Sequence, residues 1–107
     1  NDDYSDFAKK VCEGVLKNLD TSRGILICGS GVGVDITANR FKRIRAGLAI
    51  SSDQIFEARQ DDDINVLCLA SDFTDEDTAK KIIKTFLATS FDEKENHFRR
   101  IQKIDEF

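Results

Sequence analysis

The residues best suited to chemistry are a cysteine and the glycine-rich segment that follows it, Cys28-Gly-Ser-Gly-Val-Gly33. Three of the five residues after the cysteine are glycine, so their backbone amides are free to point toward one centre. Such amides hold a phosphate or a developing oxyanion, and a helix that starts after the loop adds its positive end. The same surroundings favour the thiolate of Cys28, which can act as a general base or as a nucleophile.

Other interpretations of this loop compete on sequence grounds. A dinucleotide fingerprint needs G-x-G-x-x-G, and the spacing here is one residue short. A P-loop ends in Gly-Lys-Ser/Thr, which is absent, and a phosphotyrosine phosphatase loop needs an arginine where Val34 stands. A purely structural interpretation also remains open, in which the segment is a tight turn and the cysteine is buried.

The periodicity of apolar residues predicts the elements that must hold the loop. Apolar side chains recur at helical spacing in some segments and form short continuous runs typical of buried strands in others. Ser52 is the expected cap of one helix, and Thr74-Asp-Glu-Asp77 resembles a capping box at the start of another. We expect helices over 5–19, 35–41, 52–60, 74–89 and 94–104, and strands over 24–28, 44–50 and 65–70.

This alternation predicts an α/β fold, a three-layer Rossmann-like parallel sheet with helices on both faces. In such sheets ligands bind beyond the carboxyl ends of the strands. The loops after Cys28, Ile50 and Ala70 lie at that edge in this arrangement.

Length and composition favour one compact domain over residues 1–107. A net charge of −4 argues against a general nucleic-acid binder, and no apolar run is long enough for a membrane helix. One histidine excludes a metal site built on two, and three widely spaced cysteines favour a reducing compartment, the cytoplasm.

The glycine loop carries a resemblance to a known family. The segment 24–41, GILICGSGVGVDITANRF, followed by Ile44-Arg-Ala46, is similar to the ribose-5-phosphate isomerase type B family, which includes the galactose-6-phosphate isomerase subunits. The family typically has G-I-L-I-C-G-T-G-I-G-x-S-I-A-A-N-K and then G-I-R-A. Asp3-Tyr-Ser-Asp-Phe-Ala8 and Asn65-Val-Leu67 resemble its D-Y-P-D-Y-A and N-V-L.

The resemblance implies an aldose–ketose isomerase of a phosphorylated sugar, with ribose 5-phosphate and ribulose 5-phosphate as the first pair to consider. Cys28 would move a proton between C1 and C2 through a cis-enediolate, whose oxygens the loop amides would hold. Neither a metal nor an organic cofactor is implied. Family members form dimers, or dimers of dimers, with sites shared between subunits. The implied substrate-binding residues are Gly29, Ser30, Gly31, Val32, Gly33 and Arg100, with Arg99 as the neighbour if the alignment slips. Ser30 keeps the hydroxyl of the family's usual threonine and is also implied to be catalytic.

The chain departs from the family pattern in three places. Nothing matches the family's first strand with its Asp-His-Ala-Gly motif, so we expect the chain to be the C-terminal two-thirds of a family domain, possessing little activity alone. Asp61 and Asp62 stand where the family has the ring-opening histidine and an asparagine, which makes them the catalytic and substrate-binding candidates there. Asp72 and Asn96 replace arginines that meet phosphate. These changes motivate an alternative, a non-catalytic sugar-phosphate-binding module of the same fold.

The remaining candidate residues each have a functional and a structural interpretation. The 61–63 aspartates could bind Mg²⁺ or form a solvated loop cap. His97 could touch phosphate or lie on the surface of a charged helix. Cys12 and Cys68 are expected in the core, and Asn39 is expected to fix the loop. Arg40, Lys42, Arg43 and Arg45 form a basic patch near the glycine loop, which could steer an anion or be a solvated face.

Overall fold

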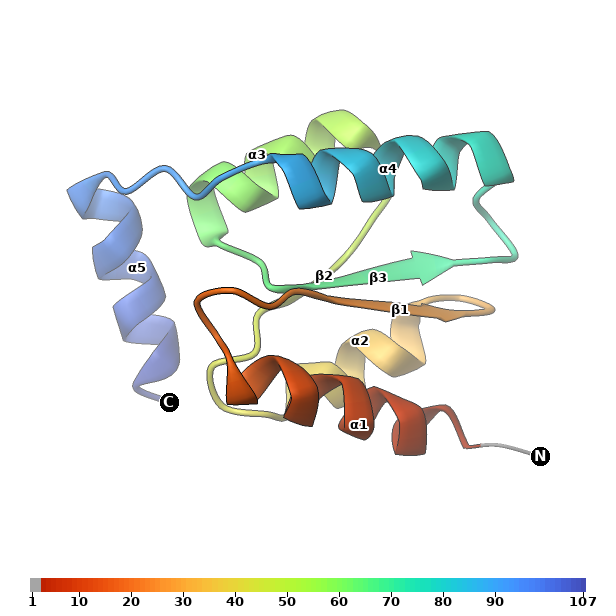
Figure 1. Cartoon of the computed structure of the whole chain (residues 1–107), viewed down its shortest axis with the longest axis horizontal. Helices are drawn as coiled ribbons and strands as arrows, with labels where there is room; N and C mark the ends of the chain where they lie inside the picture. Colours follow the sequence, from red (N-terminus) through yellow and green to blue (C-terminus); the bar gives the residue numbers. More distant parts are fainter. Residues whose placement is uncertain (1–2) are drawn as a thin grey trace.

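A computed structural model describes residues 3–107 and shows a parallel sheet between two layers of helices (Figure 1). The alternation of strands and helices agrees with the sequence prediction. In chain order the elements are α1 (Tyr4–Lys17), β1 (Gly24–Cys28), α2 (Val32–Ala38), β2 (Ala46–Leu48), α3 (Ser52–Asp62), β3 (Val66–Ala70), α4 (Glu76–Ala88) and α5 (Glu95–Asp105).

The strand order is β1-β3-β2, and both pairings are parallel. The central strand β3 is buried along its whole length, as expected for a strand covered on both faces. Helices α1 and α2 cover one face of the sheet and α3 and α4 the other, while α5 stands at one end (Figure 1). The carboxyl ends of the strands therefore meet at one edge, and α5 lies at the opposite, amino edge.

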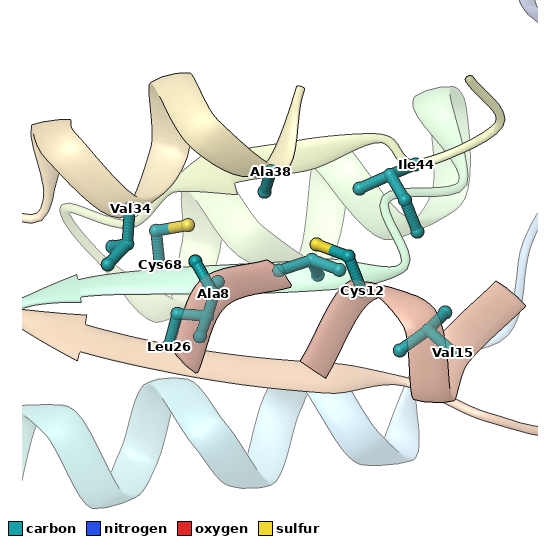
Figure 2. Packing of buried hydrophobic residues seen from close by; sticks show 9 residues of the cluster. Ala8, Cys12, Val15, Leu26, Val34, Ala38, Ile44 and Cys68 are labelled. Atoms are coloured by element: carbon teal, nitrogen blue, oxygen red, sulfur yellow. The ribbon is translucent and has the colours of Figure 1, made fainter. Parts of the chain in front are cut away.

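The sheet buries a separate apolar cluster on each face. Figure 2 shows the cluster beneath α1 and α2, which contains Cys12 and Cys68. Both thiols are fully buried, as predicted, and burial raises the pKa of each. Phe86 and Ile55 are the largest buried side chains of the other cluster. Two of the three thiols are therefore neutral core groups.

The element boundaries differ from the prediction where a turn residue decides them. Helix α2 begins at Val32, three residues earlier than expected, because Gly31 takes a left-handed φ of 75° and turns the chain directly into the helix. Strand β2 keeps only three of the seven predicted residues. The caps are Ser51 and Asp75, one residue away from Ser52 and Thr74, since their side chains accept from the amides three residues on.

Side-chain amides close the outer edge of β2. Asn39 Oδ1 accepts the N–H of Ala46 at 2.9 Å, and its Nδ2 donates to the Ala46 carbonyl at 3.1 Å. Gln54 pairs in the same way, donating to the Leu48 carbonyl at 3.0 Å and accepting the N–H of Ile50 at 2.8 Å. These bonds satisfy backbone groups that would otherwise invite pairing with another strand. Asn39 was expected to fix the loop, but its side chain bonds to Asp35 and Ala46 and so joins α2 to β2 instead.

A buried arginine ties α3 to the end of α4 and to the segment before β3. Arg59 is only 2% exposed, and its guanidinium donates to the carbonyls of Thr89 at 2.9 Å and Ile64 at 2.7 Å. Its charge is balanced by Asp63, 2.8 Å away. The sequence showed a charged residue here, and the fold makes it part of the core.

Candidate functional site

The glycine loop runs from the end of β1 into α2 at the carboxyl edge of the sheet. A methyl group on Gly31 would collide with Leu48 Cδ1 and lie 3.1 Å from the Leu69 carbonyl carbon. The loop therefore packs directly on β2 and β3, and only glycine combines this contact with the left-handed backbone.

The ring of Tyr4, at the start of α1, lies against the other side of the loop. A Cβ on Gly33 would sit 2.7 Å from two ring carbons of Tyr4. No local pattern in the sequence predicts this contact beyond the glycine itself. The loop therefore packs against β2 and β3 on one side and against α1 on another.

The backbone amides of this loop are the donors it can offer. Ser30 Oγ accepts the N–H of Val32 at 3.2 Å, so that amide is already engaged. Within residues 3–107, no hydrogen bond uses the N–H of Gly31, Gly33 or Val34. These amides are available to an anionic oxygen placed at the loop, as the sequence predicted.

Cys28 ends β1 directly before these amides and is partly exposed. Its carbonyl accepts the Ser71 N–H at 2.9 Å, which fastens the loop after β3 to the site. Because Cys12 and Cys68 are buried and their raised pKa values keep them protonated, Cys28 is the thiol able to take part in chemistry.

Asp35 is the acidic group of the first turn of α2, behind the loop. Burial raises the pKa of its carboxyl, and a hydrogen bond with the Cys68 thiol opposes that effect. Asn39 Nδ2 lies 3.4 Å from Asp35 Oδ1, so the carboxyl belongs to the network that joins α2 to β2.

The structure does not bring Asp61, Asp62 or Arg100 to the glycine loop within one chain. Asp61 and Asp62 form the last turn of α3, and exposed Arg100 lies on α5; both elements end at the amino edge. Strand β1 separates that edge from Cys28, and its five residues span roughly 16 Å at ~3.3 Å per residue.

Two predictions about this opposite edge are wrong. The basic residues do not lie near the glycine loop, because the chain returns to the amino edge after α2; they line a hollow of about 850 Å³ there, beside α5. His97 is not a surface residue, since it is only 8% exposed. Its Nε2 is 3.7 Å from Asp61 Oδ1, and its Nδ1 is 3.9 Å from Asp92 Oδ1 and is buried without a hydrogen-bond partner in the described chain.

The 61–63 aspartates are not a solvated loop cap as a group. Asp63 ends α3 with a left-handed φ of 49° and pairs with Arg59 and, at 3.1 Å, with Arg45. Among residues 3–107, no three His, Cys, Asp or Glu side chains are grouped so as to hold a metal ion. No helix in that range is long and apolar enough to cross a membrane.

Comparison with known proteins agrees with the loop and the fold. Residues 1–104 match the family described as Ribose/Galactose Isomerase. A probable ribose-5-phosphate isomerase B of Mycoplasma genitalium is 49% identical over 104 residues, which cover 97% of this chain and 68% of that protein.

Solved structures give the same result. The ribose-5-phosphate isomerase B of M. genitalium with bound ribulose-5-phosphate has a TM-score of 0.94 at 47% identity, covering 99% of this chain and 69% of that one. A ribose 5-phosphate isomerase of Thermotoga maritima has a TM-score of 0.93 at 43% identity, covering 100% and 72%. The chain therefore belongs to the ribose/galactose isomerase family.

Proposed function

We propose that this protein interconverts the aldose and ketose forms of a phosphorylated sugar, with Cys28 as the general base. The observation that carries the proposal is the partly exposed Cys28 thiol directly before a loop whose amides at Gly31, Gly33 and Val34 are free. A base and oxyanion donors next to each other are what proton transfer beside a carbonyl requires.

In the proposed reaction the Cys28 thiolate removes the proton from C2 of the open-chain aldose. The electron pair forms the C1–C2 double bond of a cis-enediolate, and the charge moves to the carbonyl oxygen. The free amides stabilise that oxygen, and the proton of the C2 hydroxyl moves to the C1 oxygen. The thiol then gives its proton to C1, and the electron pair left on the C2 oxygen forms the C2 carbonyl of the ketose. Groups of these two kinds each contribute on the order of 10² or more to rate.

The substrate pair we propose is ribose 5-phosphate and ribulose 5-phosphate. Support comes from the M. genitalium protein, which is 47% identical and was solved with bound ribulose-5-phosphate. The pair also agrees with a loop that offers donors to sugar oxygens.

We further propose that a second copy of the chain completes the site. Asp61, Asp62 and Arg100 lie on elements at the amino edge, whereas Cys28 is at the carboxyl end of β1, whose five residues span roughly 16 Å; this is too far for them to act on the same sugar carbons from one chain. Exposed apolar side chains on α5, Phe98 and Ile104, suit contact with a partner. In this arrangement Ser30 and Asp62 bind substrate, Asp61 assists ring opening, and Arg100 meets the phosphate.

Mixing two inactive variants tests this sharing. Cys28→Ala and Arg100→Ala affect different halves of a shared site, so a homodimer of either is impaired while a mixed dimer has one intact site. Activity that returns on unfolding and refolding the two together supports a shared site. Activity that stays absent, with dimers present by light scattering, contradicts it.

Turnover of ribose 5-phosphate by wild type and Cys28→Ala tests the reaction itself. Wild type is expected to form ribulose 5-phosphate, and Cys28→Ala is expected to lose at least about 10²-fold in rate. Ile27→Ala, beside it on β1 with an exposed side chain, serves as a control and should retain activity. Equal rates in Cys28→Ala and wild type would refute the base.

The competing candidate is a module that binds sugar phosphate without converting it. It is favoured by the aspartate at position 61, a weaker acid–base group near neutral pH than the family's histidine. Binding of ribulose 5-phosphate without isomerisation would support it, and measurable turnover would exclude it. For either candidate we propose one domain over residues 1–107 and a reducing, cytoplasmic setting, in line with three free thiols.

A further inference from the structure

The carboxylate of Asp72 lies against the glycine loop. The Asp72 N–H donates to the Gly29 carbonyl at 3.0 Å, which pairs the loop after β3 with the loop after β1. A Cβ on Gly29 would lie 2.8 Å from Asp72 Oδ2 and 3.9 Å from Oδ1. A negative charge is therefore held against the residue that follows Cys28.

The backbone that carries this carboxylate is held by hydrogen bonds, and the carboxylate itself is free to bind. Ser71, the preceding residue, donates to the Cys28 carbonyl through its N–H at 2.9 Å and its Oγ at 3.3 Å. The N–H of Phe73 closes the turn on the Ala70 carbonyl at 3.1 Å. The Asp72 side chain is exposed, and within residues 3–107 no hydrogen bond or ion pair engages it. Its oxygens are available to an incoming molecule.

The charge and the amides at this site favour different parts of a sugar phosphate. The free amides suit one singly charged oxygen, whereas a phosphate dianion beside Asp72 meets repulsion at short range. Ionised carboxylates accept strong hydrogen bonds from hydroxyl groups. The hydroxyl-bearing end of the molecule is therefore stabilised here and the phosphate end is not.

We propose that Asp72 is a specificity-determining residue: it accepts a hydrogen bond from a sugar hydroxyl next to the reacting carbons and excludes phosphate from the glycine loop. This inference rests on the proposed function, because it assigns an orientation to the substrate of that same site. It places the reacting carbons at Cys28 and the phosphate away from Asp72.

Alkylation of Cys28 measures the charge without needing turnover. Iodoacetate is an anion and iodoacetamide is neutral, so the ratio of their rates at Cys28 reports the local potential. Cys12 and Cys68 are 0% exposed and should not react in the folded chain. Asp72→Asn keeps the shape, removes the charge, and should raise the iodoacetate-to-iodoacetamide ratio by about three- to tenfold, an effect that shrinks in high salt.

Asp20→Asn is the matched control, because Asp20 is an exposed carboxylate between α1 and β1, at the amino edge. It should leave the ratio at the wild-type value. An equal ratio in wild type and Asp72→Asn would overturn the proposal, as would an equal rise in Asp20→Asn.

Protection of Cys28 from iodoacetamide tests the two ligand preferences. Ribose 5-phosphate should protect wild type and protect Asp72→Asn less, whereas inorganic phosphate should protect Asp72→Asn more than wild type. Equal protection of both proteins by both ligands would overturn the role of Asp72. Protection by ribose 5-phosphate without any turnover would instead refute the proposed isomerisation and leave the role of Asp72 standing.

Discussion

Replacing Gly31 by alanine perturbs the point where the glycine loop meets the sheet. The residue has a φ of 75°, and a left-handed backbone costs an alanine about 1–2 kcal/mol. The new methyl group would collide with Leu48 Cδ1 and approach the backbone of Leu69 and Ala70 at 3.1 and 3.2 Å. Overpacking of this kind typically costs about 1–3 kcal/mol, so we expect a total loss of about 2–5 kcal/mol.

Urea denaturation measures this loss, and Gly14→Ala is the control. Gly14 lies within α1 with no atom within 4 Å of a built Cβ, so alanine there should stabilise the protein by about 0.5–1 kcal/mol. Adding Leu48→Ala to Gly31→Ala should relieve the side-chain collision but not the backbone contacts, so the double variant should lose less than the sum of the single losses. If Gly31→Ala were as stable as wild type, the described loop geometry would be refuted.

Three further variants test groups around the site. Burial raises the pKa of Asp35, so the folded state binds its proton more tightly than the unfolded state and stability falls as pH rises. Asp35→Asn should therefore raise the melting temperature near pH 8, and this gain should shrink on acidification. A gain that grows on acidification would contradict this. Arg59→Met removes the donor to the buried Ile64 carbonyl and the ion pair with Asp63, and should lower the free energy of unfolding in urea by about 2–5 kcal/mol. A loss below about 1 kcal/mol would show that these bonds matter little. Asn39→Ala leaves the backbone groups at the edge of β2 without their side-chain partner and should reduce stability by about 1–2 kcal/mol in the same measurement. Glu57→Gln, at an exposed position, is the control and should leave stability unchanged. Equal stability of the two variants would show that Asn39 does not stabilise the edge of β2.

The sequence predicted the type and order of the elements because the apolar pattern is local. The limits of β1 came out correctly, since a run of apolar residues ends at a glycine. The predicted start of α2 was three residues too late, because only the φ angle of Gly31 shows that this glycine turns the chain into the helix. The cap at Ser51 was displaced by one for a similar reason: two adjacent serines are equally good caps on paper.

The candidate site was predictable only in part. Cys28 and the free amides follow from a glycine pattern within one segment. The position of Asp61 depends on the length and direction of α3, and the burial of His97 depends on how α5 packs on α3. Asp72 over Gly29 and Tyr4 over Gly33 join segments far apart in the chain; the glycines were the only local signal that something approaches closely.

Exchange of solvent deuterium into the sugar tests the central claim most directly, because it reports the proton transfer assigned to Cys28. In D₂O with ribulose 5-phosphate, wild type should incorporate deuterium at C1 of ribulose 5-phosphate and at C2 of ribose 5-phosphate, followed by NMR. Cys28→Ala, with unchanged unfolding in urea, should incorporate none at either carbon. Deuterium incorporation by Cys28→Ala at the wild-type rate would show that another group removes the proton and would contradict the account.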